Sequence, residues 1–236
     1  SLTDFANVNL RVKTNNSTGV CTGDNFNNGI YLRLFEQHVY GKRPPGISKL
    51  RIRERSRVDD ALDGKAIRRE ITVFFTDDDD GPSMDMLVYT PADATQPVPA
   101  FLGYNFHGNH STDPDPSIHI TESWVRNDAD RGNVDHRATE ESRGKSSSRW
   151  PASMIVGRGY GLATIYYGDI DPDFHDGFHN GIHKLFGDAG GDDRPGDAGG
   201  SISAWAWGLS RALDVLETDP LVDGSRVAVF GHSRLG

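Results

Sequence analysis

Apolar and polar residues alternate along two neighbouring stretches, residues 67–76 and 84–90, as they do in half-buried strands. The six residues at 77–82 read Asp-Asp-Asp-Asp-Gly-Pro, which is typical of a turn. We therefore expect a β-hairpin. The acidic run lacks the spaced acidic residues, glycine and closing glutamate of an EF-hand loop, so a solvated turn is favoured over a calcium site.

The first 65 or so residues show a weaker pattern, which we interpret as an N-terminal extension. Within it, apolar residues at helical spacing predict one helix over residues 25–40. The sequence Gly-Lys-Arg-Pro-Pro-Gly at 41–46 ends this helix.

From residue 97 the pattern changes to buried strands that alternate with helices. Residues 98–106 and 162–167 are continuous apolar runs, and Trp150-Pro151 opens a helix between them, so these segments predict a βαβ unit. Apolar residues every three or four positions predict a second helix over residues 202–216, capped by Ser201 or Ser203. An apolar strand follows at 227–230. The pattern predicts an α/β fold with a parallel sheet that helices cover on both faces.

Two long polar insertions, residues 107–149 and 168–200, begin where two of these strands end. Ligands of open α/β sheets bind at the carboxyl ends of the strands. We therefore expect the two insertions to form the rim of a cleft.

Composition excludes several classes of protein. The chain has 236 residues, 25 Lys and Arg against 34 Asp and Glu, and a net charge of −9, without the basic aromatic clusters of nucleic-acid-binding proteins. No apolar run has the length of a membrane helix, so we expect neither nucleic acid nor membrane as a partner. Cys21 is the only cysteine, which excludes an intrachain disulfide or a cysteine-based metal site within these residues.

The segment with the clearest chemistry is Gly231-His-Ser-Arg-Leu-Gly236, directly after the apolar strand at 227–230. We interpret it as a nucleophile elbow of the G-x-S-x-G type, in which small residues allow a strained turn that exposes the serine above the sheet. The backbone N–H groups of such a turn face the oxyanion of an acyl-transfer reaction. The alternative is that Ser233 only caps a helix after a tight turn.

Four segments of the chain, of which this elbow is the first, resemble the glucuronoyl esterases, carbohydrate esterase family 15, and their bacterial branch in particular. The other three are Phe101-Leu-Gly-Tyr-Asn-Phe-His-Gly-Asn109, Tyr166-Tyr-Gly-Asp-Ile-Asp-Pro172 and Trp205-Ala-Trp-Gly-Leu-Ser-Arg-Ala-Leu-Asp214. The resemblance implies a three-layer α/β-hydrolase sandwich, of which this chain is the N-terminal portion ending at the elbow. It also implies hydrolysis of the ester between glucuronic acid of glucuronoxylan and an alcohol of lignin.

By position, the resemblance makes Ser233 the nucleophile and Arg234 the residue that stabilises the oxyanion, and it identifies no substrate-binding residue. Many members have cysteine where His232 stands, so we expect His232 to be structural. The triad acid and histidine, and a lysine four positions after the serine, are expected after residue 236. We accordingly expect one α/β-hydrolase domain that is incomplete at its C-terminus and inactive without the remainder.

Other polar groups suggest weaker hypotheses. His175, His179 and His183 are spaced by four, as in some metal sites, but the glycines between them disfavour a helix. Three aspartates could bind calcium or could lie in a solvated turn, and two histidines and two tryptophans could line the cleft or be structural. The residues of these two groups are Asp169, Asp171 and Asp173, then His107, His110, Trp124 and Trp150.

We thus expect a monomeric serine esterase without metal or cofactor, acting on glucuronoxylan or lignin–carbohydrate esters. The resemblance implies a secreted or periplasmic protein, and this sequence contains no signal peptide. The alternatives that remain are a generic carboxyl or acetyl-xylan esterase, a serine peptidase, and a non-catalytic carbohydrate-binding relative.

Overall fold

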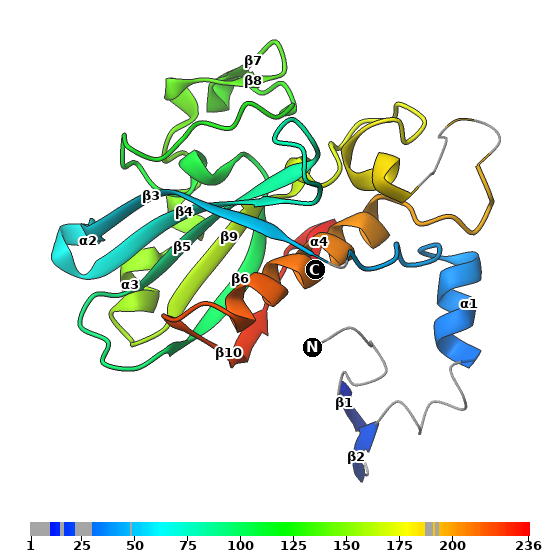
Figure 1. Cartoon of the computed structure of the whole chain (residues 1–236), viewed down its shortest axis with the longest axis horizontal. Helices are drawn as coiled ribbons and strands as arrows, with labels where there is room; N and C mark the ends of the chain where they lie inside the picture. The colour runs from blue at the N-terminus through cyan, green and yellow to red at the C-terminus, as the bar shows by residue number, and fades with distance from the viewer. Residues whose placement is uncertain (1–9, 15–16, 22–29, 48, 187–190, 192–193) are drawn as a thin grey trace.

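A six-stranded mixed sheet forms the centre of the molecule (Figure 1). The computed structural model describes residues 10–14, 17–21, 30–47, 49–186, 191 and 194–236. The strand order is β10-β6-β9-β5-β4-β3. The bounds of these strands are β3 Arg51–Asp60, β4 Ala66–Phe74, β5 Ser83–Pro91, β6 Val98–Asn105, β9 Gly161–Tyr166 and β10 Val222–Val229.

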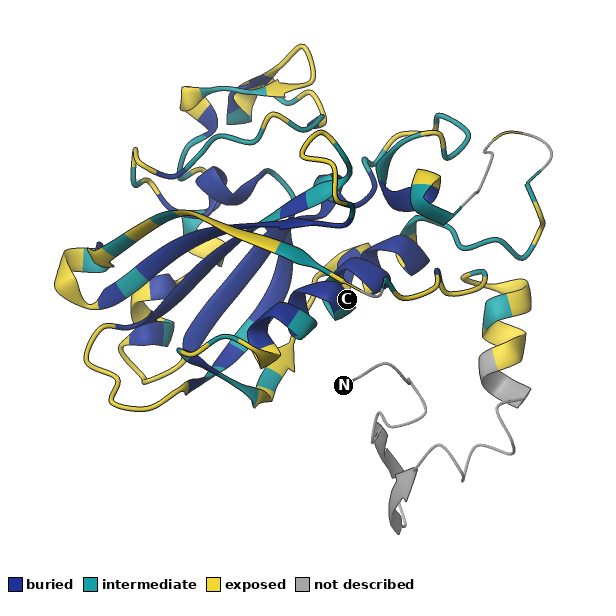
Figure 2. Cartoon of the chain, in the orientation of Figure 1, coloured by how far each residue is buried: buried dark blue, intermediate teal, exposed yellow. Residues whose placement is uncertain are grey.

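One half of the sheet is antiparallel. The predicted hairpin is confirmed: β4 and β5 pair in register from Ala66 with Pro91 to Phe74 with Ser83. The prediction missed β3, which lies within the stretch assigned to an extension but pairs antiparallel with β4. Its arginines and other polar residues conceal the strand pattern, because β3 is an edge strand that is largely exposed (Figure 2).

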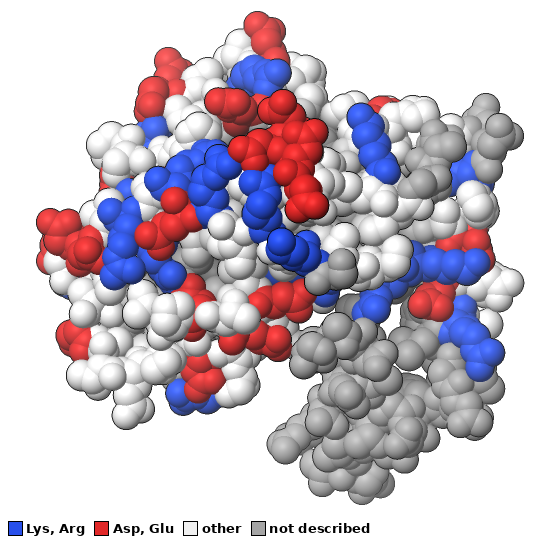
Figure 3. All heavy atoms as spheres, viewed as in Figure 1, with Lys and Arg blue, Asp and Glu red and all other residues white. Residues whose placement is uncertain are grey.

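Ion pairs hold this edge strand to the rest of the molecule. Arg51 and Arg53 both pair with Asp79 of the β4–β5 turn, at 2.5 and 2.7 Å. Arg55 lies 3.4 Å from a carboxylate oxygen of Asp85 at the start of β5. Figure 3 shows the resulting row of basic side chains along β3, with acidic side chains beside it. Asp79 of the acidic turn therefore binds two arginines of β3.

The other half of the sheet is parallel. β6 pairs parallel with both β9 and β10, and α3 (Ala152–Val156) lies between β6 and β9 in the chain, as the predicted βαβ unit requires. The predicted parallel pairing is confirmed for β6, β9 and β10, but the whole sheet is mixed, because β5 of the hairpin pairs antiparallel with β9. Only the segments after residue 97 follow the alternation of strand and helix that produces parallel pairing.

Side chains of successive strand residues enter two separate cores, which gives the three layers of an α/β sandwich. On β5, Met84, Met86 and Val88 face the core under α4 (Ser201–Glu217), whereas Leu87 and Tyr89 face the core under α3. Figure 2 shows the central strands and the inner side of α4 as buried. The α/β fold class is therefore confirmed.

Helix α4 is held by polar contacts of its aromatic residues. The Trp205 indole donates to the carbonyl of Asp171 at 3.0 Å, and the Trp207 indole donates to that of Pro45 at 2.9 Å. The Tyr104 hydroxyl of β6 donates to the carbonyl of Trp205 at 2.8 Å. The predicted serine cap is wrong: the N-cap is Gly200, and no side chain caps the helix.

The remaining elements are short. The helix predicted over residues 25–40 is α1 (Ile30–His38), and residues 25–29 lie outside the described part of the chain. The other helices and strands are β1 Leu10–Thr14, β2 Ser17–Cys21, α2 Ala61–Gly64, β7 Asn133–Val134 and β8 Arg137–Ala138. The 3₁₀ turns are η4 Asn109–Ser111, η5 Ala129–Arg131, η6 Glu140–Ser142, η7 Ser147–Arg149, η8 Tyr167–Asp169, η9 Gly181–Phe186 and η10 Ser233–Leu235. Among the described helices, none is long and apolar enough to cross a bilayer.

The Asp169 carboxyl group, in the turn after β9, binds the start of β5. Asp169 accepts hydrogen bonds from the Ser123 hydroxyl at 2.7 Å and from the backbone N–H of Asp85 at 3.1 Å. Burial, and then the charge of the Asp85 carboxylate, raises the pKa of Asp169 to about 7. In the unfolded chain this group loses its proton near pH ~4. The stability that it contributes is therefore present below that pH and is lost as the pH rises to about 7.

We expect Asp169→Asn to flatten this pH dependence. Between pH 5 and pH 8, the free energy of unfolding should fall by about 2 kcal/mol more in the wild-type protein than in the variant. Chemical denaturation at several pH values measures the difference. Substitution of the exposed Asp93 by Asn is the matched control and should keep the wild-type slope. Equal slopes in wild type and Asp169→Asn would contradict the assignment.

Candidate functional site

The chain makes a crowded bend immediately after β10. Ser233 has a φ of 57°, in the left-handed region that residues with a Cβ rarely adopt. A Cβ on Gly231 would collide with the carbonyl oxygen of Leu235, and one on Gly236 would lie 2.9 Å from the carbonyl carbon of Gly231. These contacts explain why glycines flank the bend. The prediction of a strained turn at Ser233 is confirmed.

The bend departs from the G-x-S-x-G pattern at one position. Leu235 stands two residues after the serine, and the second glycine follows at 236. Leu235 is buried and packs into the core under α4, so it anchors the bend to that core. Ser233 itself is exposed, and no hydrogen bond to its hydroxyl is found within the described residues.

Three parallel strands end at the edge where this bend lies. β6 ends at Asn105, β9 at Tyr166 and β10 at Val229, and the two long insertions follow the first two of these ends. The bend contacts both ends of the first insertion: the His232 ring lies 6.2 Å from the Phe106 ring, and the Phe230 ring lies 5.4 Å from the Trp150 ring. The first insertion therefore borders the bend at this edge, and the second reaches the same bend through Asp173.

Arg234 turns its guanidinium toward the end of β9. Its Cζ atom lies 5.2 Å from the centroid of the Phe106 ring and 5.8 Å from that of Tyr167, which are cation–π distances. Its Nη2 donates to the carboxylate of Asp173. The side chain is thus fixed by one carboxylate and two rings and remains partly exposed.

Asp173 gathers several donors at this point. Besides Arg234, it accepts from Arg126 at 2.9 Å and from the Tyr167 hydroxyl at 3.2 Å. Burial, and then the charge of Asp173, raises the pKa of Tyr167 to about 12, so the hydroxyl remains a donor at neutral pH. Two cations and a hydroxyl on one carboxylate form a rigid network around the Arg234 guanidinium.

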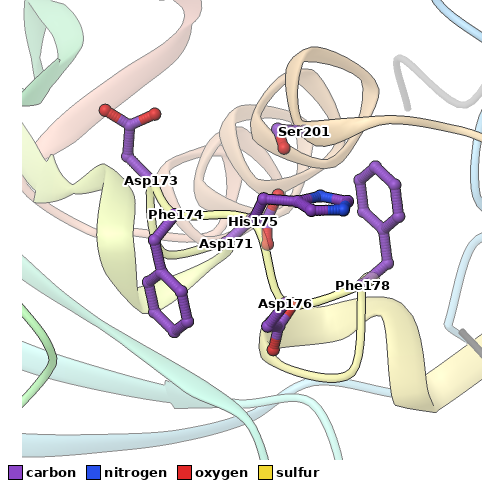
Figure 4. Close-up of a pocket in the computed structure, with 7 residues that line it drawn as sticks. All are labelled: Asp171, Asp173, Phe174, His175, Asp176, Phe178 and Ser201. Carbon is purple, nitrogen blue, oxygen red and sulfur yellow. The ribbon is translucent and has the colours of Figure 1, made fainter. Parts of the chain in front are cut away.

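Beside this network lies an acidic pocket of about 280 Å³ (Figure 4). In the figure, the carboxylate of Asp173 points away from His175, and the His175 ring points toward Phe178. The pocket lies between the second insertion and the first residue of α4. Its lining residues are Asp171, Asp173, Phe174, His175, Asp176, Phe178 and Ser201.

The structure does not bring the suggested metal ligands together. Asp169, Asp171 and Asp173 have different partners, which are Ser123, His183 and Arg234. His183 is buried 3.3 Å from Asp171, whereas His175 lines the acidic pocket and His179 is exposed. Within the described residues no group of three or more His, Cys, Asp or Glu side chains is placed to hold a metal ion.

The histidines after β6 have different surroundings. His110 is fully buried, and its Nε2 lies 2.7 Å from the Ser142 hydroxyl. Burial, and then the charge of Arg143, lowers its pKa to about 4, so His110 is a neutral structural residue. His107 lines a separate pocket together with Arg131, Lys145 and Arg149.

Of the two tryptophans, one lies at the rim and one beside the bend. Trp124 contacts Phe174 at 4.8 Å and stacks on His136 at 5.1 Å between ring centroids. Trp150 packs against Phe230 and lines the same pocket as His107.

The sequence pattern does not indicate the residues that hold Arg234. Tyr167 belongs to one of the four segments that carry the family resemblance, but Asp173 lies just beyond its end. From the sequence, Asp173 is suggested only as one of three calcium ligands. The alternation of Asp with other residues over 169–173 could not indicate which of the three aspartates faces an arginine 61 residues away.

Comparisons with known proteins agree with this geometry. The family model described as "Glucuronyl esterase, fungi" matches residues 194–236. The chain is 46% identical over 209 residues to "Carbohydrate esterase MZ0003" of an unknown prokaryotic organism, a match that covers 86% of this chain and 47% of that protein.

Solved structures give the same result. The chain is 44% identical to a glucuronoyl esterase from Solibacter usitatus, with a TM-score of 0.78 and coverage of 86% of this chain and 51% of that one. It is also 44% identical to a promiscuous CE15 esterase from a marine bacterial metagenome, with a TM-score of 0.74 and coverage of 86% and 50%. The chain thus spans about half the length of these relatives. Over the part that it shares with them, this chain belongs with the bacterial glucuronoyl esterases of carbohydrate esterase family 15.

Proposed function

We propose that the protein is a serine esterase that hydrolyses the ester between glucuronic acid of glucuronoxylan and an alcohol of lignin. The observation that carries this proposal is the exposed Ser233 in a left-handed bend at the carboxyl edge of the sheet, followed by Arg234, whose guanidinium is held by Asp173 and Phe106. The names of two similar proteins, a glucuronoyl esterase and a CE15 esterase, support the substrate class. Because that substrate belongs to the plant cell wall, we place the reaction outside the cytoplasm.

In this proposal Ser233 is the nucleophile. Its Oγ forms a bond to the ester carbonyl carbon, and its proton passes to a general base. The alcohol then leaves with a proton, and water hydrolyses the acyl-enzyme to release the uronic acid and the free serine. The strained φ of Ser233 supports this role, because strain of this kind persists only where the surroundings enforce it.

Arg234 stabilises the oxyanion in this proposal. Negative charge develops on the carbonyl oxygen in the tetrahedral transition state, and a cation fixed beforehand at that point lowers the barrier without reorganising. Asp173, Phe106 and Tyr167 supply the fixing. The pairing with Asp173 leaves the other guanidinium N–H groups available to a substrate, because arginine has five donors.

We further propose that residues 1–236 are the N-terminal portion of one α/β-hydrolase domain. The last strand supports this: Val229 is 57% and Phe230 is 39% exposed, although both are apolar. An apolar cavity of about 240 Å³ lies between α4 and the bend, lined in part by Ile202, Leu209 and Leu235. Further chain that covers this surface would supply the triad acid and histidine, which follow the serine in α/β-hydrolases.

The complete protein should hydrolyse benzyl glucuronate in preference to an aryl acetate. Ser233→Ala should abolish both activities, because the acyl-enzyme cannot form. Substitution of the exposed Ser153 on α3 by alanine is the matched control and should leave both unchanged. Initial rates on the two esters measure the outcome. A strong preference for the acetate would contradict the glucuronate assignment, and undiminished activity of Ser233→Ala would exclude Ser233 as the nucleophile.

Arg234→Ala should lower kcat on benzyl glucuronate by about 10² to 10³, the range for loss of one oxyanion donor. Arg126→Gln removes the other arginine on Asp173 and is the matched control. Its guanidinium is solvated, with 67% of the side chain exposed, so the expected change is less than about twofold. A loss below about threefold in Arg234→Ala would mean that its side chain does not reach the transition state.

Asp173→Asn should lower kcat about tenfold with little change in KM, because the guanidinium loses its charged anchor but keeps its own charge. Asp173→Glu, which keeps the carboxylate, should recover part of the loss. Steady-state kinetics on benzyl glucuronate separate the two constants, and thermal unfolding checks that both variants are folded. A rise in KM at constant kcat would instead place Asp173 in ground-state binding.

A further inference from the structure

A second pocket lies next to the bend and has the opposite charge to the acidic one. Its cavity of about 180 Å³ is formed by the first insertion and the end of β6. Three of its side chains are cations, two are aromatic, and the others are a histidine and two serines. Its lining residues are Phe106, His107, Arg131, Lys145, Ser146, Ser148, Arg149 and Trp150.

The cations of this basic pocket are largely unbalanced. Arg131 pairs with Asp128 at 3.2 Å, but neither Lys145 nor Arg149 has an ion pair with any acidic residue that the structure describes. This is unexpected in a chain with a net charge of −9, where most arginines on the surface have acidic partners. Two cations beside a cavity without counter-charges are suited to an anionic ligand.

The loop that carries these cations is well anchored. The backbone N–H of Gly144 donates to the carbonyl of His110 at 3.0 Å, and that of Ser146 donates to the carbonyl of Ser111 at 2.8 Å. Ser146 is buried, and Gly144 has a φ of 68°, which closes the turn before Lys145. The backbone of the pocket is therefore preorganised, which lowers the cost of binding.

Three neutral rings complete the pocket. Burial, and then the positive charge of Arg131, lowers the pKa of His107, so that its imidazole is neutral and can donate one hydrogen bond at neutral pH. The Trp150 and Phe106 rings add flat apolar walls. Flat apolar walls with a few convergent polar groups are typical of sites for small organic ligands.

The basic pocket and the proposed reaction centre share one wall. The Phe106 ring lines the pocket and also lies 5.2 Å from the Arg234 guanidinium carbon. Trp150, which lines the pocket as well, contacts Phe230 two residues before His232. A ligand in the pocket would thus contact the same aromatic ring that contacts the Arg234 guanidinium.

We propose that the basic pocket is a subsite for the carboxylate of a free uronic acid, with Lys145 and Arg149 as its charged ligands and Ser148 and His107 as hydrogen-bond partners. The inference rests on the proposed function, because the esterified uronate at Ser233 determines which polysaccharide lies beside the pocket. The esterified uronate is neutral and does not use these cations. The carboxylate comes from an unesterified uronic acid on the same chain or from the released product.

Direct binding to the complete protein tests the subsite, because ligands without an ester group are not hydrolysed in the proposed reaction. Calorimetric titration uses a xylo-oligosaccharide with one unesterified glucuronic acid, the neutral oligosaccharide of equal length, and glucuronic acid itself. Lys145→Gln with Arg149→Gln should weaken binding of the acidic oligosaccharide about tenfold, as expected for two solvent-accessible charged contacts, and leave the neutral one unchanged. Added salt should weaken binding of the acidic oligosaccharide and leave binding of the neutral one unchanged.

The controls separate charge from folding and distinguish the two sources of the carboxylate. Lys65→Gln with Arg158→Gln removes two exposed cations elsewhere and should have no effect, whereas Lys145→Arg with Arg149→Lys should retain binding. An equal loss for glucuronic acid identifies the product as a ligand, and a loss confined to the oligosaccharide identifies a neighbouring uronate. A change below twofold with every acidic ligand, or an equal loss in the control pair, would overturn the proposal. Failure of the wild-type protein to hydrolyse benzyl glucuronate would contradict the proposed function alone, because binding is measured without turnover.

Discussion

The structure of the site depends on the steric crowding of the bend after β10. Leu235 is drawn into the core under α4, and its carbonyl oxygen then comes so close to residue 231 that only glycine fits there. This closure places Ser233 at a φ of 57° and directs its side chain to solvent. The energy for the strained turn comes from burial of Leu235 and from the pairing of β10 with β6, both a few residues away.

A second constraint connects the bend to the insertion after β9. The Arg234 guanidinium could take many directions on its flexible stem, and it is the Asp173 carboxylate that selects one of them. Asp173 lies seven residues after the end of β9, and the Trp205 indole fixes the same insertion by binding the carbonyl of Asp171. Helix α4 therefore supports both the buried side of the bend and the loop that orients its arginine.

The sequence predicts those parts of this arrangement that depend on neighbouring residues, and not those that depend on residues far apart in the chain. The β4–β5 hairpin, the βαβ unit, α4 and the strained serine all follow from local patterns, and the structure confirms them. Strand β3 could not be predicted from apolar alternation, because arginines that bind a distant acidic turn occupy its exposed face. Likewise, nothing near Asp173 in the sequence indicates its arginine partner, since the contact depends on how the insertion folds.

Acidic and basic side chains near the bend line two different pockets. Asp171, Asp173 and Asp176 line one pocket, and Arg131, Lys145 and Arg149 line the other. An ester group is neutral, so neither pocket attracts or repels the reacting group before cleavage. Once hydrolysis converts the ester to a carboxylate, the basic pocket attracts it, whereas no Lys or Arg lines the acidic pocket. In the proposed reaction, this difference in charge between the two pockets therefore acts on the released acid after cleavage. Before cleavage, it acts only on uronic acids that are already unesterified.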